Sequence, residues 1–401
     1  MGFRYFKEIM SREGEANILN AAGMKSGNRK IILEKLRISP VSRAELARQT
    51  GLTRSAVGVI AEQLLSEGIL KEGENIVGNI GRRSVELRFN PDKYCIAGIN
   101  IARDCCTVGI ADFAGDIRHT AKIQLTREAE VPEILEKIYL TLINILDYNS
   151  SGDKLLGIGI TSPGPVDSIK GRIINPPNFP KWENLNITAY FEDKFKCPVL
   201  LENNAIALAL AERYFGIGGR YRSYIELSVD TGVGAGMILD NRLYKGTAGF
   251  GSDFGHITVN IDGEQCSCGN HGCVELYSSI PNIVKYAGEK NPLLTSWEII
   301  VKQARSGAED ARGIVEREAD YLSAIITSAM NILDVEAIIL AGDITCDSDL
   351  IIPMLEKRVN RQFIGKTVKK VEVVSSGLKL PANILSCINM VLEYFIQTIE
   401  I

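Results

Sequence analysis

The sequence predicts an α/β protein in two parts: a small helical domain that ends in a two-stranded wing, and a larger body of strands and helices. Three observations predict this. Apolar residues recur at helical spacing in short segments before residue 66. From residue 94 the pattern changes to short apolar strands and amphipathic helices. The chain's 401 residues are also too many for one small core, so two or three domains are expected.

Charge is distributed unevenly along the chain. Residues 1–90 contain 15 Lys/Arg and 10 Asp/Glu, whereas the remainder contains 30 and 39. A basic head on an acidic body indicates a nucleic-acid-binding module attached to a domain with another task. No apolar run reaches membrane-spanning length and no leader opens the chain, so we expect a cytoplasmic protein without membrane contact. Nine cysteines, an odd number, fit reduced thiols and a metal better than a disulfide framework.

The head begins with a segment of unassigned role. Residues 1–26 are predicted to be a polar N-terminal extension with one amphipathic helix over 15–24. Residues 27–90 have the pattern of a winged helix-turn-helix domain. Its first helix is expected over 28–37, and Pro40 breaks the pattern after it.

The second and third helices of the head begin at recognisable caps. Ser42 and Glu45 form a capping box that opens a helix over 43–49. Gly51 makes the turn, and Thr53 caps the third helix. Because this helix has an apolar face at helical spacing, its opposite face is expected to meet solvent or DNA.

The third helix has polar side chains near its start, where a recognition helix meets base edges and phosphates. Strands over 69–72 and 84–89 would form the wing, and the flexible tip between them suits phosphate or minor-groove contact. The expected partner is a palindromic, A·T-rich double-stranded DNA operator. A small helical domain with a solvated charged face is the alternative. The predicted DNA-contacting residues are Arg43, Thr53, Arg54, Ser55, Gly81, Arg82 and Arg83.

The body is predicted to span residues 94–401, after a turn-forming stretch at 90–93 that could act as a hinge. Three strands, an amphipathic helix and a buried strand come first, and a second hairpin opens another half of the body. The two halves show no repeat at the residue level. The expected strands are 96–101, 107–112, 117–125, 155–161, 200–202, 224–228, 235–239 and 337–341, and the expected helices are 134–149, 205–214, 296–305, 315–333, 351–358 and 381–398.

Three cysteines lie close together near the middle of the body. Cys266, Cys268 and Cys273 follow a C-x-C-x4-C spacing, and His256 lies ten residues upstream. Three thiolates and one imidazole make a closed tetrahedral set, the arrangement of a structural zinc site. On spacing alone His271 is a rival fourth ligand. For the whole cluster, three free cysteines, or one disulfide with one cysteine left over, are the alternatives.

This stretch resembles the signature of the ROK family of sugar kinases and sugar-responsive repressors, in which G-H is followed by C-x-C-G-x-x-G-C-x-E. The resemblance covers about residue 28 to the C-terminus, and it implies an actin-like, ribonuclease H-like fold of two lobes with a zinc loop at 256–273. In the family the G-H histidine is a zinc ligand, which favours His256 over His271. Residues 27–90 resemble the DNA-binding head of the family's repressors. The family's kinases lack this head.

Several departures from the family's kinase motifs bear on catalysis. The first phosphate loop, D-x-G-G-T in the family, is N-I-A-R-D at 100–104, and side chains in place of its glycines would crowd a phosphate. The second loop, 230–234, is nearly kept, and the adenosine wall at 341–345 is degraded. The catalytic aspartate of E-N-D-A is here Asn204, which cannot act as a base near neutral pH. We therefore expect no enzyme activity.

The sugar-binding motifs are better preserved. Asp253 stands where the family has glutamate, so its reach is one methylene shorter, and the segment 177–179 matches the family's P-N-L. Convergent amides and carboxylates suit a ligand with many hydroxyl groups. The resemblance implies a sugar effector site formed by Asn178, Asn203, Asn204, Asp253, His256 and Glu275.

These features together predict a sugar-responsive transcriptional repressor with a structural zinc ion. A homodimer or higher homo-oligomer is expected, because one small helix-turn-helix module rarely supplies enough affinity or specificity. Sugar binding is expected to lower operator affinity. Two alternatives remain at this point: an active ATP-dependent sugar kinase with a regulatory DNA-binding head, and a constitutive repressor or scaffold without a small ligand.

Overall fold

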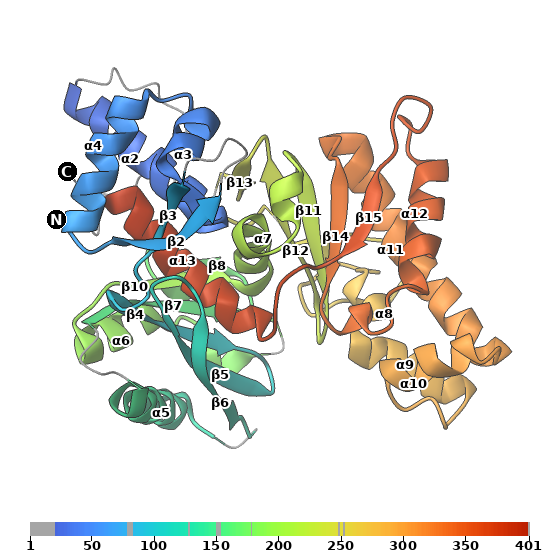
Figure 1. Cartoon of the computed structure of the whole chain (residues 1–401). Helices are drawn as coiled ribbons and strands as arrows, with labels where there is room; N and C mark the ends of the chain where they lie inside the picture. Colours follow the sequence, from blue (N-terminus) through green and yellow to red (C-terminus); the bar gives the residue numbers. More distant parts are fainter. Residues whose placement is uncertain are drawn as a thin grey trace. The chain divides into compact units, whose positions relative to one another are not determined.

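The protein is described by a computed structural model, whose described ranges are 21–77, 83–126, 129–149, 154–177, 179–247, 249–251 and 253–399 (Figure 1). Two compact units make up the chain. Unit 1 comprises Met1–Ile174, Lys181–Glu202 and Pro381–Ile401, and unit 2 comprises Asn175–Pro180 and Asn203–Leu380. Within the described ranges, none of the helices has the length and apolar character needed to span a membrane.

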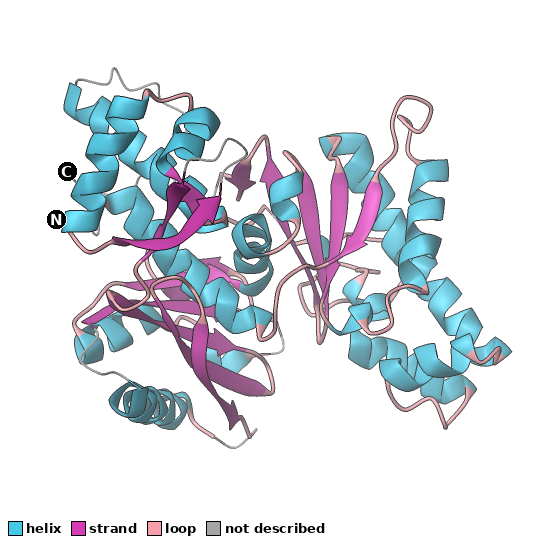
Figure 2. Cartoon of the chain, in the orientation of Figure 1, coloured by secondary structure: helices cyan, strands magenta, loops and turns pink. Residues whose placement is uncertain are grey.

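The described part of unit 1 begins with a small domain of three helices and a three-stranded sheet (Figure 2). The predicted caps are confirmed: the Ser42 hydroxyl accepts a hydrogen bond from the Glu45 N–H, and the Thr53 hydroxyl accepts one from the Ala56 N–H. The arrangement fits the predicted winged-helix domain. Its elements are α2 (Ala21–Ile38), β1 (Val41–Ser42), α3 (Arg43–Thr50), α4 (Arg54–Ser66), β2 (Leu70–Val77) and β3 (Arg83–Phe89).

The first helix begins earlier than predicted, at Ala21, so it includes the end of the amphipathic segment 15–24. Residues 15–20 of that segment lie outside the described residues. Gly51 follows α3 with φ of 71°, a left-handed conformation that favours glycine and ends the helix at the predicted turn.

The rest of unit 1 is a five-stranded sheet, in the order β10-β7-β4-β5-β6, with helices packed against it. Strands β4 to β6 are antiparallel neighbours, and β7 runs parallel to β4. Helix α13 lies against the sheet at Gly159, where an added Cβ would fall 2.0 Å from the Cys387 carbonyl oxygen. The elements are β4 (Tyr94–Ile101), β5 (Cys105–Asp112), β6 (Ile117–Gln124), α5 (Val131–Asn149), β7 (Lys154–Ser162), β8 (Val166–Asp167), β9 (Arg172–Ile173), α6 (Ile187–Phe195), β10 (Val199–Asn203) and α13 (Ala382–Thr398).

Unit 2 repeats this strand order in a second five-stranded sheet, β13-β12-β11-β14-β15. Strands β11 to β13 form the antiparallel part, and β14 and β15 continue it in parallel. The repeat of topology without a repeat of sequence agrees with the predicted pair of similar lobes. The elements are α7 (Asn204–Phe215), β11 (Tyr224–Val229), β12 (Val233–Leu239), β13 (Arg242–Tyr244), α8 (Glu275–Ser278), α9 (Ile280–Lys290), α10 (Trp297–Arg305), α11 (Glu309–Leu333), β14 (Ala337–Ala341), α12 (Ile351–Gln362) and β15 (Glu372–Ser375), with 3-10 turns η1 (Pro180–Trp182), η2 (Gly218–Arg220), η3 (Phe254–His256) and η4 (Asp343–Thr345).

A buried arginine joins the small domain to the rest of unit 1. Arg37, at the end of α2, has a side chain that is 2% exposed and pairs with Glu393 of α13 at 2.7 Å. Its guanidinium also donates to the Asn389 carbonyl oxygen at 2.8 Å and to the Asn389 side-chain oxygen. Because these groups are buried, the arginine fixes where α2 lies on α13.

Aromatic rings extend the same contact. Phe89 at the end of β3 packs edge-to-face on Phe113 with centroids 5.2 Å apart, and Phe113 packs on Phe395 of α13 at 5.1 Å. Asp92, within the expected hinge, pairs with Arg118 of β6 at 3.7 Å. The connector between the small domain and the sheet is therefore tied to its surroundings by both apolar and polar contacts.

One buried carboxyl in unit 2 makes stability depend on pH. Glu318 of α11 is fully buried, and burial raises its pKa to about 8, opposed by Ser278 and Arg317. The folded state therefore holds a proton that the unfolded state releases near pH 4.5, the ordinary value for a glutamate. Between pH 4.5 and 8 this group should reduce the free energy of unfolding by up to about 1.4 kcal/mol per pH unit as pH rises.

Glu318→Gln should flatten this dependence and raise the melting temperature at pH 7.5, because an amide stays neutral. Glu316→Gln is the matched control, since Glu316 lies on the same helix with a side chain that is 45% exposed. Thermal unfolding measured from pH 5 to 8 tests the assignment. Parallel pH profiles for the wild type and Glu318→Gln would contradict it.

Candidate functional site

Four side chains of unit 2 converge in the loop between η3 and α8. The ligand atoms of His256, Cys266, Cys268 and Cys273 all lie within 4.8 Å of one another. His256 Nδ1 is 3.7 Å from Cys266 Sγ, and Cys268 Sγ is 3.7 Å from Cys273 Sγ. A tetrahedral ion with bonds of about 2.3 Å to sulfur places its sulfurs roughly 3.8 Å apart. The four groups could therefore hold one metal ion, and the sulfur separation is too long for a disulfide.

The loop backbone is shaped to bring these groups together. Gly272 has φ of 59°, and an added Cβ there would fall 1.7 Å from the Asn260 carbonyl oxygen. The Asn270 side chain donates to the His256 carbonyl oxygen at 3.1 Å. His271, the rival ligand, points elsewhere: its Nδ1 lies 3.4 Å from the Gly263 carbonyl oxygen. The structure therefore favours His256 as the fourth ligand.

The Cys273 thiol would need a nearby cation to ionise at neutral pH. Burial, followed by the neighbouring thiols of Cys266 and Cys268, raises the pKa of Cys273 to about 12. A thiol with such a pKa stays protonated at neutral pH unless a positive charge is added. A bound metal ion supplies that charge and displaces the protons.

Two predicted effector carboxylates flank this metal loop. Glu275 opens α8 two residues after Cys273, and its Oε2 accepts a hydrogen bond from the Val233 N–H at 2.9 Å. Asp253 immediately precedes η3, which ends at His256. Burial raises the pKa of Asp253, His256 opposes the shift, and the Glu275 charge adds to it. The three side chains are thus close enough to influence one another electrostatically.

The two predicted amides lie at the start of α7. Asn203 is the N-cap, and its Oδ1 accepts from the Ala205 N–H at 2.9 Å, so the side chain has a structural task beside its predicted role. Asn204 is the first residue of α7 and half-buried. The next residue, Ala205, packs against Gly234, where an added Cβ would be 3.0 Å from the alanine Cβ.

Val233 and Gly234 are thus contacted by Glu275 and by Ala205, the residue that follows Asn204. The first helical turn of α7, where Asn203 and Asn204 lie, and the carboxylate of Glu275 are therefore near the same short loop. Asn178, the sixth predicted effector residue, lies outside the described residues.

The loop at 230–234, which the sequence retains, is closed by its own first side chain. Asp230 Oδ1 accepts a hydrogen bond from the Asp343 N–H at 2.6 Å. Gly342 has φ of 87°, and an added Cβ there would fall 2.7 Å from the Asp230 carboxylate. Burial raises the pKa of Asp230, and the hydrogen bond from Asp343 opposes the shift. The Asp343 N–H is thus already engaged by the Asp230 carboxylate.

The degraded first loop begins in an internal polar network of unit 1. Asn100 is 6% exposed, and its amide donates to the Thr161 hydroxyl at 2.9 Å. Its oxygen accepts from the Asn383 side chain of α13 at 3.1 Å. The Asn100 side chain, which replaces the family's metal-orienting acid, is therefore hydrogen-bonded to other side chains of unit 1.

The predicted DNA-contacting residues differ in what they do in the structure. Arg54 and Ser55 are exposed at the start of α4. Thr53 is also exposed, and its hydroxyl caps the helix. The Arg43 guanidinium pairs with Glu62 at 2.7 Å and Glu72 at 3.1 Å, and therefore links α4 to β2. Gly81 and Arg82 lie outside the described residues, and Arg83 begins β3 without a described side chain.

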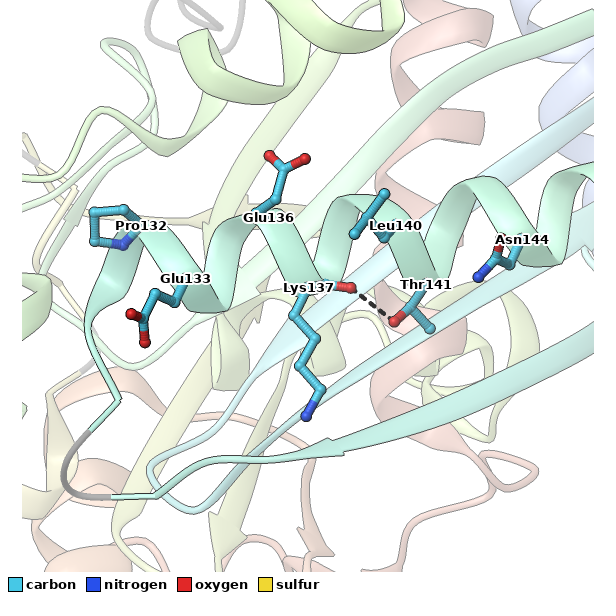
Figure 3. A pocket seen from close by; sticks show the side chains of 7 residues that line it. All are labelled: Pro132, Glu133, Glu136, Lys137, Leu140, Thr141 and Asn144. Carbon is cyan, nitrogen blue, oxygen red and sulfur yellow. Dashed lines mark hydrogen bonds between the residues drawn. The ribbon is translucent and has the colours of Figure 1, made fainter.

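A shallow surface hollow runs along α5, where it is lined by side chains of that helix alone (Figure 3). The one hydrogen bond drawn there, from the Thr141 hydroxyl to the Lys137 carbonyl oxygen, is internal to the helix. The hollow contains none of the predicted site residues, and its lining brings together no set of convergent polar groups. The chemistry of the loop between η3 and α8 therefore identifies the site better than this concavity does. The lining residues are Pro132, Glu133, Glu136, Lys137, Leu140, Thr141 and Asn144.

Comparison with known proteins agrees with the fold and the motifs. The ROK family description matches residues 96–385. A xylose repressor of Bacillus spizizenii is 30% identical over 387 residues, covering 96% of this chain and 100% of that protein. The solved structure of a ROK family transcriptional regulator, a homologue of the E. coli MLC protein, has a TM-score of 0.79 at 23% identity and covers 94% of this chain and 97% of that one.

A ROK family glucokinase from Streptomyces griseus, solved with glucose and AMPPNP, has a TM-score of 0.64 at 26% identity. It covers 74% of this chain and 98% of its own. The likeness to both structures confirms the predicted actin-like body, and the first of them, which covers 94% of this chain, fits the winged-helix domain that precedes it. Because the family description and the repressor match span most of its length, the chain belongs to the ROK family.

Proposed function

We propose that this protein is a DNA-binding transcriptional repressor whose operator affinity is controlled by a sugar or sugar derivative. The observation that carries the proposal is a winged-helix domain and a ROK body in one chain, matched along almost its whole length by a xylose repressor. The kinase structure covers only 74% of the chain. Sugar phosphorylation does not require a helix that exposes Arg54 and Ser55, whereas DNA recognition does.

The effector site is proposed to lie in unit 2 around Val233 and Gly234. Glu275 and Asp253 supply acceptors, His256 supplies a ring N–H opposite its metal-binding nitrogen, and Asn204 supplies an amide. With Asn178 and Asn203, these are the groups that would bind a polyhydroxylated ligand. The relative's name makes xylose the first compound to test, followed by glucose and their phosphates.

Zinc is the proposed metal, because one imidazole and three thiolates in a closed tetrahedral set suit this ion. Its proposed role is structural. The ion would hold His256 and, through Cys273, the start of α8, so that Glu275 stays against Val233. Chemistry at an open coordination position is not required of it.

A homodimer is proposed for DNA binding, because two heads double the contacts and match a palindromic operator. Sugar binding would change the placement of the heads and weaken operator affinity, a coupling typically of about 5- to 150-fold. Operator binding places the protein with the chromosome, in the cytoplasm.

The function is tested with full-length protein and a random-sequence duplex pool. We expect selection to enrich one duplex, and a sugar that raises the melting temperature to weaken binding of that duplex by about tenfold. Arg54→Ala should weaken duplex binding by about 1–3 kcal/mol and keep the sugar-induced thermal shift. Asn204→Ala should instead reduce the sugar-induced thermal shift and leave duplex binding unchanged.

Failure to enrich any duplex would refute the repressor assignment. A specific duplex whose binding no sugar changes would instead support a constitutive repressor. The double change Arg82→Ala and Arg83→Ala distinguishes the contribution of the wing from that of the recognition helix. Loss of phosphate contacts should weaken binding to most sequences. It should also reduce the slope of log affinity against log salt concentration by about one per lost contact.

Kinase activity is expected to be absent. Asn204 offers no general base, whose loss alone commonly costs about 10²–10⁴-fold, and Asp230 places a carboxyl on the Asp343 N–H beside the second loop. A coupled ADP-release assay with each sugar that raises the melting temperature should give the rate of a no-enzyme control. Clear turnover that Asn204→Ala abolishes would establish the alternative, an active kinase with a regulatory head.

A further inference from the structure

Helix α4 has a buried face and an exposed face, and one apolar side chain lies on the exposed one. Val59 is 54% exposed, whereas the core residues of the helix are at most 4% exposed. At about 100° per residue, Val59 is only about 40° around the helix from Ser55 and one turn farther along it. The core residues are Val57, Ile60, Ala61 and Leu64.

Neither packing nor helix propensity accounts for a valine at this position. A β-branched residue is a weaker helix former than alanine, and this one gains little from burial. A single exposed valine is ordinary on a protein surface. Its position matters here because it shares a face with Ser55, one of the predicted base-contacting residues.

The surroundings of Val59 leave this face of α4 accessible to a groove of DNA. An added Cβ at Gly58 would meet nothing within 4 Å, so the backbone beside Val59 is uncovered. Glu62, one turn farther on, has a charge that would repel phosphates, and Arg43, which Glu62 shares with Glu72, offsets part of it from 2.7 Å. The exposed side of α4 therefore presents the cation of Arg54 at its start, and then the Ser55 hydroxyl and the apolar Val59 on one face, beside an acid that is paired with an arginine.

In the major groove the one apolar group that a base pair displays is the C5 methyl of thymine. Given the repressor function proposed above, we propose that Val59 contacts a thymine methyl in each half-site and thereby specifies an A·T pair. Arg54 and Ser55 would contact the neighbouring pairs, because they lie nearer the start of the helix.

Deoxyuridine provides the test, because it keeps every hydrogen-bonding group of thymidine and lacks only the methyl. The probe is the duplex that the full-length protein selects from a random pool, with each thymine replaced in turn. One replacement per half-site should weaken wild-type binding about three- to fivefold, the worth of one buried methyl group. Val59→Ala should bind the thymine duplex about as weakly as the wild type binds the deoxyuridine duplex, and should show no further loss with deoxyuridine.

Ile38→Ala is the matched control, since Ile38 is also 54% exposed in the same domain but lies at the end of α2. It should retain the full deoxyuridine penalty. Val59→Thr, which keeps one γ-methyl, should retain part of it. The inference is overturned if no thymine shows a penalty in the wild type, or if the penalty persists unchanged in Val59→Ala. Those outcomes leave the repressor function standing, whereas failure to select any duplex removes both.

Discussion

Replacing Cys268 by serine is expected to reduce bound zinc from about one ion per chain to a small fraction of that, and to abolish the response to sugar. Cys268 is the exposed member of the cluster, so its loss removes a ligand without opening a cavity. Without the ion, the buried thiol of Cys273 remains protonated, and the loop loses the bonds that hold His256. Glu275 then loses its fixed position against Val233.

Metal analysis of purified protein gives the ion count, and the sugar-induced thermal shift gives the effector response. Cys346→Ser is the matched control, because Cys346 is a half-buried cysteine of unit 2 outside the cluster. It should keep both the zinc and the shift. A Cys268→Ser protein that keeps full zinc and the full shift would show that the cluster is neither the metal site nor a support for the effector site.

Short-range features of the fold could be predicted because their causes are local. The caps at Ser42 and Thr53 depend on a hydroxyl and an N–H three residues apart, and both form as expected. The strands of both hairpins follow from alternation and turns over a few residues. The metal cluster was also predictable, since three of its four ligands lie within eight residues.

The elements missed by the sequence analysis are short or lack periodicity. Strands β13 and β15 have three and four residues, too few to show alternation. Helix α6 has nine residues and α9 has eleven, and neither was predicted. Helix α6 begins at an Asn186 cap, a local sequence signal for a helix start.

Long-range contacts could not be predicted from spacing, and several of them define function. The loop at 230–234 was interpreted as nearly intact, yet Asp230 closes onto Asp343, 113 residues later. Asn100 was known to replace an acid, but its partner Asn383 is 283 residues away. Only folding brings such distant residues together. The sequence therefore shows which residue differs from the family, but not which contacts that residue makes in the folded protein.

Replacing Arg37 by alanine is expected to destabilise unit 1 by about 3–5 kcal/mol, because it leaves a buried carboxylate without its counter-charge. Glu393 is 12% exposed and cannot recover full hydration. The Asn389 carbonyl and side-chain oxygens lose their donor at the same time. Operator affinity should fall as well, because α2 is no longer held on α13 and the head loses its fixed placement.

Arg48→Ala is the control, since Arg48 belongs to the same domain and forms an ion pair with Glu45 while 78% exposed. An exposed pair contributes at most about 1 kcal/mol, so this change should barely alter the urea midpoint. Arg37→Met combined with Glu393→Met should recover part of the loss, because apolar replacement of both partners removes the unpaired charge. Equal midpoints for Arg37→Ala and Arg48→Ala would mean that the buried pair does not anchor the head, and that the connector contacts, Phe89 with Phe113 and Asp92 with Arg118, hold it instead.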